Sequence, residues 1–336
     1  MAQQRGRAYI GISGWRYAPW RGVFYPPGLV QREELAFAAA TFSTIEINGT
    51  FYSLQRPDYF REWRQQTSAA FRFAVKAPRY ITHIRRLRDI EKPLANFFAS
   101  GVLALDDRLG PLLWQFPPSF AYDEARFSRF LDQLPRTTHE ALALARRRET
   151  TRMRGRTALP RLPERPLRHA VEIRHESFRS AAFAQALRQR GVALVVADTA
   201  GRWPLIEEVT ADFVYLRLHG DKALYESGYS AQALDWWATR IDAWRLGTQP
   251  DDARRIDTSP LSRRPRDVYC YFDNDVKVHA PFDAYDLSVR LGVAAGTPPR
   301  RQSDAADGET ARTDWPWRRT SHATRPREAR RPKSRG

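Results

Sequence analysis

The chain has 336 residues, of which 42% are hydrophobic, so it can form one large domain or two of ordinary size. Its formal net charge is +17 at pH 7, yet no apolar run is long enough to span a bilayer, and the first residues lack the apolar centre of a signal peptide. The single cysteine, Cys270, excludes an internal disulfide, and its apolar strand pattern predicts a packed thiol. These features indicate a protein of the reducing cytoplasm without a membrane partner.

Apolar segments with strand character alternate with helical segments along most of the chain. The predicted strands are Tyr9–Trp15, Thr44–Tyr52, Arg72–Ala77, Gly110–Phe116, Ala170–Arg174, Ala193–Asp198, Phe213–Leu218 and Asp267–Phe272. The predicted helices are Arg32–Thr41, Pro57–Gln66, Pro93–Ala104, one that Asp123 caps and that runs to Leu134, Ser180–Gln189, Ser230–Leu246 and Pro281–Leu291, with a shorter helix at His139–Arg148 and a helical turn at Leu205–Glu208. Eight strands alternating with helices over about 290 residues predict a (β/α)8 TIM barrel, an α/β fold, in a single domain at residues 1–295. The alternative, a doubly wound open sheet, usually has fewer strands and a glycine-rich first turn, which residues 13–16 lack.

The basic charge is concentrated in two segments that look irregular in sequence. Residues 296–336 contain 11 Lys/Arg and 5 Asp/Glu, and residues 137–168 contain 9 Arg and 3 Glu, so each segment contributes +6. We predict a basic insertion at 137–168, after the fourth helix, and a disordered Arg/Pro-rich tail at 296–336. The net charge therefore says little about any pocket, although such a tail can bind nucleic acid through its phosphates.

Several predicted strands carry polar side chains at alternate positions. In Ala170–His175, Glu172 and Arg174 face opposite to Val171 and Ile173. Buried charges are costly unless they are paired or used, and barrel active sites lie at the C-terminal ends of the strands. We therefore expect a shared polar pocket there, with a structural ion-pair network as the alternative. Its expected residues are Trp15, Glu46, Asn48, Lys76, Gln115, Glu172, Arg174, Asp198, Arg217, His219 and Asn274.

A series of motifs in order carries a family resemblance. They are Gly11-Ile12-Ser13-Gly14-Trp15, Trp20-Arg21-Gly22-Val23-Phe24-Tyr25-Pro26, Thr44-Ile45-Glu46-Ile47-Asn48-Gly49-Thr50-Phe51-Tyr52, Phe73-Ala74-Val75-Lys76-Ala77-Pro78, Thr82-His83, Leu113-Trp114-Gln115-Phe116-Pro117-Pro118, Glu172-Ile173-Arg174-His175, Tyr215-Leu216-Arg217-Leu218-His219-Gly220 and Phe272-Asp273-Asn274-Asp275. Over Tyr9–Leu291 the chain resembles the DUF72 family, also called YecE-like. The resemblance implies a TIM barrel but supplies no activity, because the family is named for a domain of unknown function. Where the family pattern often has paired Asn after the last strand, this chain has Asp273-Asn274, which makes that rim more acidic.

The favoured hypothesis is acid/base chemistry on a small anionic or polyhydroxylated, sugar-like substrate. Its catalytic residues are Glu46 and Glu172 as the acid/base pair, His219 as a proton-transfer partner, and Lys76. Lys76 is either a Schiff-base lysine or a fixed cation, and the many nearby carboxylates favour the fixed cation. The substrate-binding residues are Trp15, Asn48, Gln115, Arg174, Asp198, Arg217 and Asn274. No cofactor or metal is required by this hypothesis.

Two other hypotheses use the same sequence features. His175, Asp198, His219 and Glu172 have the residue types of a divalent-metal site, which would suit a phosphodiesterase or nuclease, although no HxH or HExxH spacing is present. A non-catalytic barrel that binds nucleic acid through its basic segments is the third hypothesis. The sequence leaves the substrate, the reaction and the oligomeric state open.

Overall fold

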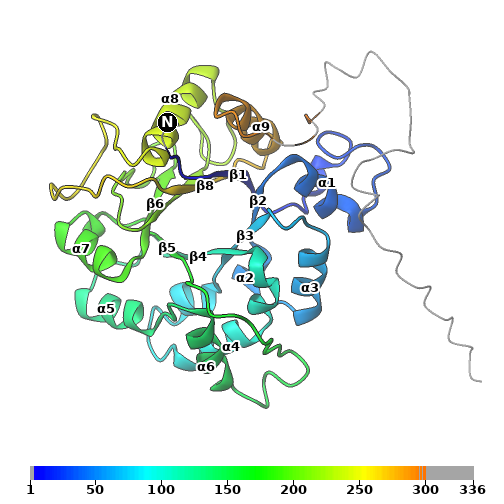
Figure 1. Ribbon diagram of the computed structural model, residues 1–336, viewed down its shortest axis with the longest axis vertical. Coiled ribbons are helices and arrows are strands. Elements are labelled where there is room, and N and C mark those ends of the chain that lie inside the picture. The colour runs from blue at the N-terminus through cyan, green and yellow to red at the C-terminus, as the bar shows by residue number, and fades with distance from the viewer. Residues whose placement is uncertain (1–3, 295, 297, 300–336) are drawn as a thin grey trace, which may run out of the picture.

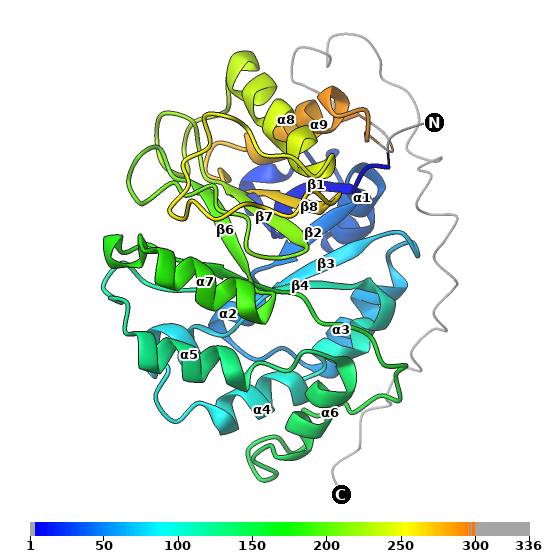
Figure 2. The ribbon, with the colours of Figure 1, turned by 60° about the vertical axis from the view of Figure 1, so that its left-hand side comes forward.

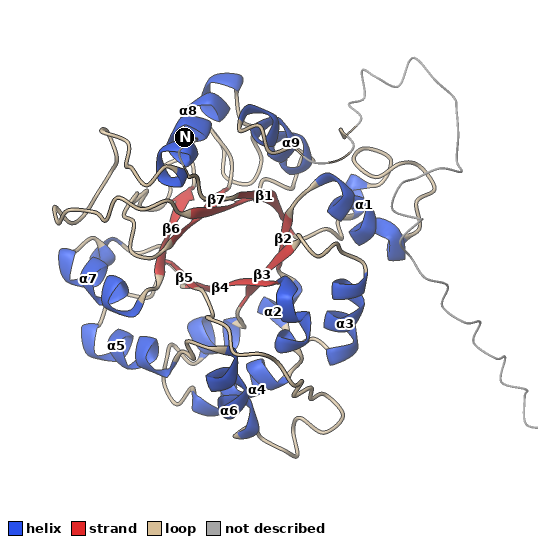
Figure 3. Cartoon of the chain, viewed as in Figure 1, coloured by secondary structure: helices blue, strands red, loops and turns tan. Residues whose placement is uncertain are grey.

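Eight parallel strands form a closed barrel in the computed structural model, which describes residues 4–294, 296, 298 and 299. The strands are β1 Ala8–Ser13, β2 Thr44–Ile47, β3 Arg72–Lys76, β4 Leu109–Gln115, β5 His169–Glu172, β6 Ala193–Asp198, β7 Phe213–Leu218 and β8 Asp267–Phe272. Each strand pairs with the next in sequence, and β8 closes the ring against β1 (Figure 3). This arrangement confirms the predicted (β/α)8 TIM barrel.

Helices surround the barrel, as Figures 1 and 2 show from two directions. The α-helices are α1 Glu34–Thr41, α2 Gly49–Tyr52, α3 Pro57–Gln65, α4 Glu91–Ala99, α5 Glu124–Gln133, α6 Thr138–Arg146, α7 Ala181–Arg190, α8 Ala231–Arg245 and α9 Ala280–Arg290, with shorter 3-10 or π segments at Ala18–Trp20, Gln31–Glu33, Tyr80–Ile84, Val102–Arg108 and Glu176–Phe178. The sequence determines several helix starts, because Asp123, Ser180 and Ser230 each accept a hydrogen bond from a backbone N–H of the first turn. In the part of the chain that the structure describes, no helix is both long and apolar enough to cross a membrane.

Aromatic side chains fill much of the barrel interior, where branched aliphatic residues are more usual. The inner cluster contains Tyr9, Phe213, Tyr215, Tyr269 and Tyr271 among smaller apolar residues. Tyr215 packs beside Tyr271 with 5.1 Å between ring centroids, and its hydroxyl donates a 2.6 Å hydrogen bond to Glu46. Because alternate residues of a strand face the same side, the inward positions that follow these two tyrosines are Arg217 and Asp273. The aromatic layer therefore lies directly beneath the polar residues of the mouth.

The predicted strand Thr44–Tyr52 is only half correct. The strand ends at Ile47, and the following residues form the short helix α2. The cause is a hydrogen bond that the sequence pattern does not reveal: the Thr50 hydroxyl donates to the carbonyl of Lys76 at 2.6 Å. This contact fixes α2 against the end of β3 and places Phe51 beside the mouth of the barrel.

The helical turn predicted at Leu205–Glu208 is also wrong, because this segment is irregular. Its two acidic residues are buried and bind the long connection before β8. The backbone N–H of Glu207 donates to Arg254 at 2.9 Å, and Glu208 accepts hydrogen bonds from the backbone N–H groups of Ile256 and Asp257. A helical turn would direct these groups away from their partners.

The basic segment 137–168 contains ordered structure that joins it to the barrel. Its helix α6 begins at the N-cap Thr137 and packs against α4, as both ribbon views show. Beyond the helix, Asn96 and Glu149 exchange two hydrogen bonds, and the N–H of Ala158 donates to Ala99 at 2.9 Å. The predicted helix in this segment is therefore confirmed. The domain end at residue 295 stays a prediction, and residues 300–336 of the predicted tail lie outside the described residues.

Candidate active site

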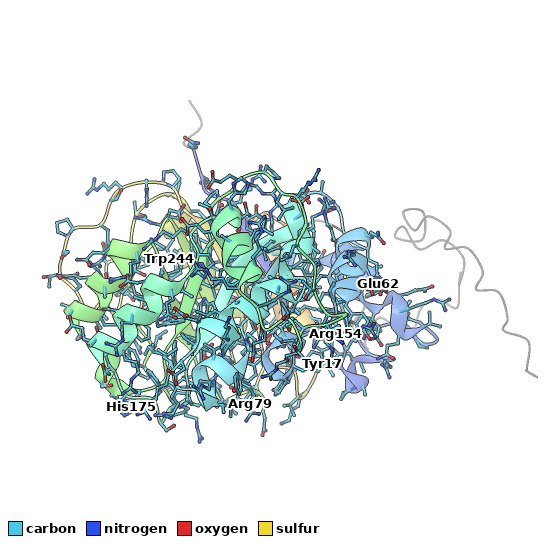
Figure 4. All side chains as sticks on the ribbon, turned by 90° about the horizontal axis from the view of Figure 1, so that it is seen from below. Tyr17, Glu62, Arg79, Arg154, His175 and Trp244 are labelled. Carbon is cyan, nitrogen blue, oxygen red and sulfur yellow. The ribbon has the colours of Figure 1, made fainter. Side chains whose placement is uncertain are left out.

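A cavity of about 670 Å³ opens at the C-terminal mouth of the barrel, a volume within the range of small-molecule sites. In Figure 4, Tyr17, Arg79 and His175, which follow β1, β3 and β5, lie toward the lower edge of the view, which is this end of the barrel. The polar residues that line the cavity are Arg16, Asn48, Gln55, Lys76, His83, Gln115, Arg174, Tyr225, Asp273 and Asp275. Its aromatic lining consists of Trp15, Tyr17, Phe51, Tyr52 and Trp63. Residues from distant parts of the chain therefore form one polar cavity.

Arg217 is the centre of a buried ion network beneath this cavity. Its guanidinium donates to both oxygens of Glu46 at 2.9 and 3.2 Å, to Glu172 at 2.9 Å and to Asp273 at 2.7 Å. Arg217 is fully buried, and so are Glu46 and Glu172. Its guanidinium also donates to Ser13 at 3.1 Å and lies 3.5 Å from Nε2 of His219. One arginine from β7 thus joins a carboxylate within β2, one at the end of β5 and one directly after β8.

Glu46 and Glu172 have their oxygens occupied by protein groups. Glu46 accepts hydrogen bonds from Ser13 and Tyr215 at 2.6 Å each, in addition to those from Arg217. Glu172 accepts from Gln115 at 2.8 Å and from Arg174 at 2.9 Å. Burial alone would raise the pKa of Glu172, but Arg174 and Arg217 hold it well below its usual range. Neither glutamate lines the cavity, so both lie behind its wall as paired groups.

Lys76, at the end of β3, has a different environment from the arginines. Its Nζ lies 4.4 Å from the centroid of the Phe51 ring. No described residue makes a hydrogen bond or an ion pair with Nζ, although the side chain is buried and lines the cavity. Burial and the charge of Arg217 lower the pKa of Lys76 from 10.5 to about 8. The carboxylates that the sequence analysis expected around this lysine are engaged by Arg217 and Arg174 instead.

Arg174 brings a second cation to the cavity wall. It follows β5, stacks on Trp203 at 3.8 Å, and donates to Glu172 and to the hydroxyl of Tyr225. These contacts fix the plane of the guanidinium while part of it remains in contact with the cavity. Arg174 and Lys76 together make this side of the cavity suitable for an anionic group.

Two carboxyl groups after β8 form the opposite, acidic side. Burial would raise the pKa of Asp273, but Arg217 and His219 hold it well below its usual range. Burial and the negative charge of Asp273 raise the pKa of Asp275 well above its usual range. The pKa of Asp273 and the pKa of Asp275 are therefore driven in opposite directions. Such divergent pairs of carboxyl groups are typical of sites that transfer protons.

Two histidines near the cavity are neutral at physiological pH. His219 is fully buried behind the cavity wall with Nδ1 3.1 Å from Asp273, and burial and Arg217 lower its pKa. His83 lines the cavity and packs edge-on against Phe51, and burial and the charge of Lys76 lower its pKa to about 4. The sequence analysis expected His219 at the site but did not select His83, although Thr82-His83 is one of the family-like motifs.

The expected site residues fall into three groups in the structure. Those in the cavity wall are Trp15, Asn48, Lys76, Gln115 and Arg174, and those behind it are Glu46, Glu172, Arg217 and His219. Asp198 and Asn274 lie elsewhere. Asp198 accepts a hydrogen bond from Tyr229 at 3.1 Å and lines a separate hollow, and Asn274 donates to Ser227 and Asp283. The polar lining residues that sequence reasoning did not select are Arg16, Gln55, His83, Tyr225, Asp273 and Asp275.

The four residues considered for a metal site are not brought together. His175 is half-buried and caps the short helix at Glu176–Phe178, whereas Asp198 belongs to the separate hollow. Among the described residues no three His, Cys, Asp or Glu side chains form a group that could hold a metal ion.

The fold and this cavity define a TIM-barrel protein with a charged site at the C-terminal mouth. Residues 9–306 match the family described as a protein of unknown function, DUF72, and the chain belongs to that family. It is 34% identical to the UPF0759 protein YecE of Escherichia coli K12 over 128 residues, and 27% identical to the UPF0759 protein YunF of Bacillus subtilis 168 over 117 residues. These matches cover 38% and 33% of this chain and only 44% and 40% of the two relatives.

Solved structures of DUF72 proteins show the same fold. A family member from Thermotoga maritima MSB8 aligns with a TM-score of 0.63 at 25% identity, covering 85% of this chain and 99% of that chain. A family member from Enterococcus faecalis V583 aligns with a TM-score of 0.61 at 15% identity, covering 85% and 96%. The resemblance to DUF72 inferred from the sequence motifs is therefore confirmed, together with its implied TIM barrel.

Proposed function

We propose that this protein is an enzyme that performs acid/base chemistry on a small anionic or polyhydroxylated substrate in the cavity at the barrel mouth. The observation that carries the proposal is Lys76, a buried cation facing the cavity without a carboxylate bonded to its Nζ among the described residues. A structural ion network has no need of such a group, whereas an anionic ligand does. The fully buried Cys270 fits the cytoplasmic location that we also propose.

Each side of the cavity has its own role in this proposal. Lys76 and Arg174 hold the anionic group of the substrate. Asp275 donates a proton, and Asp273, held by Arg217, keeps Asp275 protonated until the substrate arrives. Glu46 and Glu172 therefore act as positioning residues for the two arginines, in place of the acid/base pair expected from the sequence.

Unsatisfied polar atoms in the cavity wall support a polar substrate. Within the described part of the chain, the indole Nε1 of Trp15 and the amide Oδ1 of Asn48 are buried and have no hydrogen-bond partner. Buried polar groups normally have partners, so a substrate hydroxyl or carboxylate is suited to bind them. One donor and one acceptor beside an aromatic ring are also what a sugar-like molecule requires.

The test is a thermal-shift screen of the whole chain with sugar phosphates, 2-oxo acids and hydroxy acids. A ligand should raise the unfolding midpoint of the wild type, and Lys76→Met and Arg174→Met should each abolish most of that shift. Lys92→Met is the matched control, because Lys92 is exposed and outside the cavity. Shifts that survive both cavity substitutions would contradict the proposal.

A second candidate, binding of single-stranded nucleic acid, is favoured by a cleft of about 550 Å³ that shares Phe51 and Tyr52 with the cavity. The cleft is lined by Arg85, Lys92, Arg152 and Arg156. Tyr52 is 72% exposed and Tyr80 is 40% exposed, so bases can stack on them. Labelled oligonucleotides should then bind in a salt-dependent way that Arg152→Gln with Arg156→Gln weakens. Binding that is unchanged in this double variant would exclude the cleft as the nucleic-acid site.

A further inference from the structure

We propose that Lys76 forms a covalent imine with the substrate, which makes a small aldehyde, ketone or 2-oxo acid with an anionic group the substrate class of this cavity. The inference rests on the proposed function, since it uses the same cavity and the same arginine for the anion. It goes further than the proposed function because it assigns the Lys76 amine as a nucleophile and a C=N bond to the substrate.

The first support is the choice of lysine at this position. Of the 55 Lys and Arg residues, only five are lysines, namely Lys76, Lys92, Lys222, Lys277 and Lys333. Three of the others, Lys92, Lys222 and Lys277, are exposed. Among the described residues, the remaining buried cations are Arg217, Arg240, Arg245 and Arg266. Arg16 and Arg174 also line the cavity. Among the described residues, however, the buried cation there without a hydrogen-bonded carboxylate is a lysine, and only lysine can act as a neutral nucleophile.

The second support is the surroundings of the amine. Phe51 covers one side of Nζ at 4.4 Å, and the charge of Arg217 disfavours a second positive charge nearby. Glu46, Asp273 and Glu172, which bond to Arg217 at 2.7–3.2 Å, act in the opposite direction on the pKa of Lys76, but burial and Arg217 outweigh them. An apolar wall and a neighbouring cation are the two features that activate imine-forming lysines.

The third support is that the cavity supplies the protons the reaction needs. The Lys76 amine attacks the carbonyl carbon and forms the C–N bond, while the Asp275 carboxyl gives its proton to the carbonyl oxygen. Asp275 then takes a proton from nitrogen, returns it to the hydroxyl, and water leaves as the C=N bond forms. Starting from the neutral amine and the protonated Asp275, the products are the iminium ion, one water and the Asp275 carboxylate, so no oxidant or additional proton is required. Arg174 binds the anionic group during these steps.

Reductive trapping of the whole chain tests the inference. Pyruvate and glyceraldehyde 3-phosphate serve as probes with sodium cyanoborohydride, and peptide mass spectrometry locates the secondary amine. The Lys76 peptide should be labelled about tenfold or more faster than those of Lys92, Lys222 and Lys277, because a pKa near 8 leaves far more neutral amine at pH 7.5. Lactate has the carboxylate of pyruvate but no ketone group, so it should compete with pyruvate for the cavity without labelling Lys76.

Two variants separate this inference from the proposed function. Lys76→Arg should keep the anion-dependent thermal shift but lose the trapped adduct, and Asp275→Asn should slow trapping. Labelling of Lys76 no faster than the three exposed lysines would overturn the imine, even if ligands still stabilise the protein. If no anionic ligand stabilises the wild type, the proposed function fails as well.

Discussion

Replacing Arg217 by methionine tests the energetic role of the ion network beneath the cavity. The substitution keeps much of the side-chain length but removes four hydrogen bonds to Glu46, Glu172 and Asp273. Removing one partner of a buried pair costs about 3–5 kcal/mol, because the remaining charge is left uncompensated. Since whole domains are stable by only about 5–15 kcal/mol, the loss should be large. We expect the free energy of unfolding to fall by about 3–5 kcal/mol at pH 7.5.

The pH dependence of this loss follows from the direction of the pKa shifts. In the wild type the pKa values of Glu172 and Asp273 lie below their values in the unfolded chain. Both groups therefore add to the free energy of unfolding above the unfolded pKa, and this stabilisation is lost as the pH falls through the folded pKa. Without Arg217, both folded pKa values should rise, and the buried carboxylates take up protons on mild acidification. The difference in the free energy of unfolding between the wild type and Arg217→Met should therefore become smaller as the pH is lowered from 7.5 to 5.

Urea unfolding followed by circular dichroism measures both quantities. Arg190→Met is the control, because Asp132, the ion-pair partner of Arg190, is 58% exposed and such a pair should contribute at most about 1 kcal/mol. Adding Glu46→Gln and Glu172→Gln to Arg217→Met should recover part of the loss, since fewer charges then remain unpaired. A loss of less than about 1 kcal/mol, or one equally large at pH 5, would refute the reasoning.

Three further predictions address individual groups of the site. Lys76→Met should raise the free energy of unfolding at pH 7, and this gain should disappear by about pH 10.5. The reason is that the pKa of Lys76 is about 8 in the folded protein and 10.5 when unperturbed, so wild-type stability rises with pH from about 8 to 10.5. Urea titrations from pH 7 to 10.5 would show this, and a gain independent of pH would contradict it. Asp275→Asn should change stability by less than about 1 kcal/mol, whereas Asp273→Asn should lose about 1–3 kcal/mol by weakening an ionised partner of a buried arginine; equal losses in urea unfolding would contradict this assignment. Asp198→Asn should leave the thermal shift by any cavity ligand unchanged, and a lost shift would extend the site to the separate hollow.

The strand pattern allowed both the barrel and the deepest polar residues to be predicted. The bounds of β6, β7 and β8 agree with those expected from the sequence. Within a strand the alternation of side chains is strict, so placing Glu172 and Arg217 inside the barrel required only the register of their own strands. Burial then made it necessary for them to be paired, and the ion network is the result.

Beyond the strand ends this rule no longer holds. Thr50, Phe51 and Tyr52 have the residue types of a strand, yet a hydrogen bond from Thr50 to β3 fixes them as α2. After β8, the side chain of Asp273 faces the cavity and that of Asn274 faces away toward Asp283. Which carboxyl is ionised depends on cross-barrel neighbours, and these contacts are not contained in any local pattern.

The geometry of arginine explains why the site can have an uncommitted lysine at all. Arg217 presents five N–H donors in a planar fork, and with them it contacts three carboxylates from different strands. A lysine at this position would have three donors from a single point and would leave one carboxylate for Lys76 to neutralise. The carboxylates Glu46, Glu172 and Asp273 all make direct contacts with Arg217, and Glu172 also contacts Arg174. The arginines therefore occupy these carboxylates, and the amine of Lys76 stays available to a ligand.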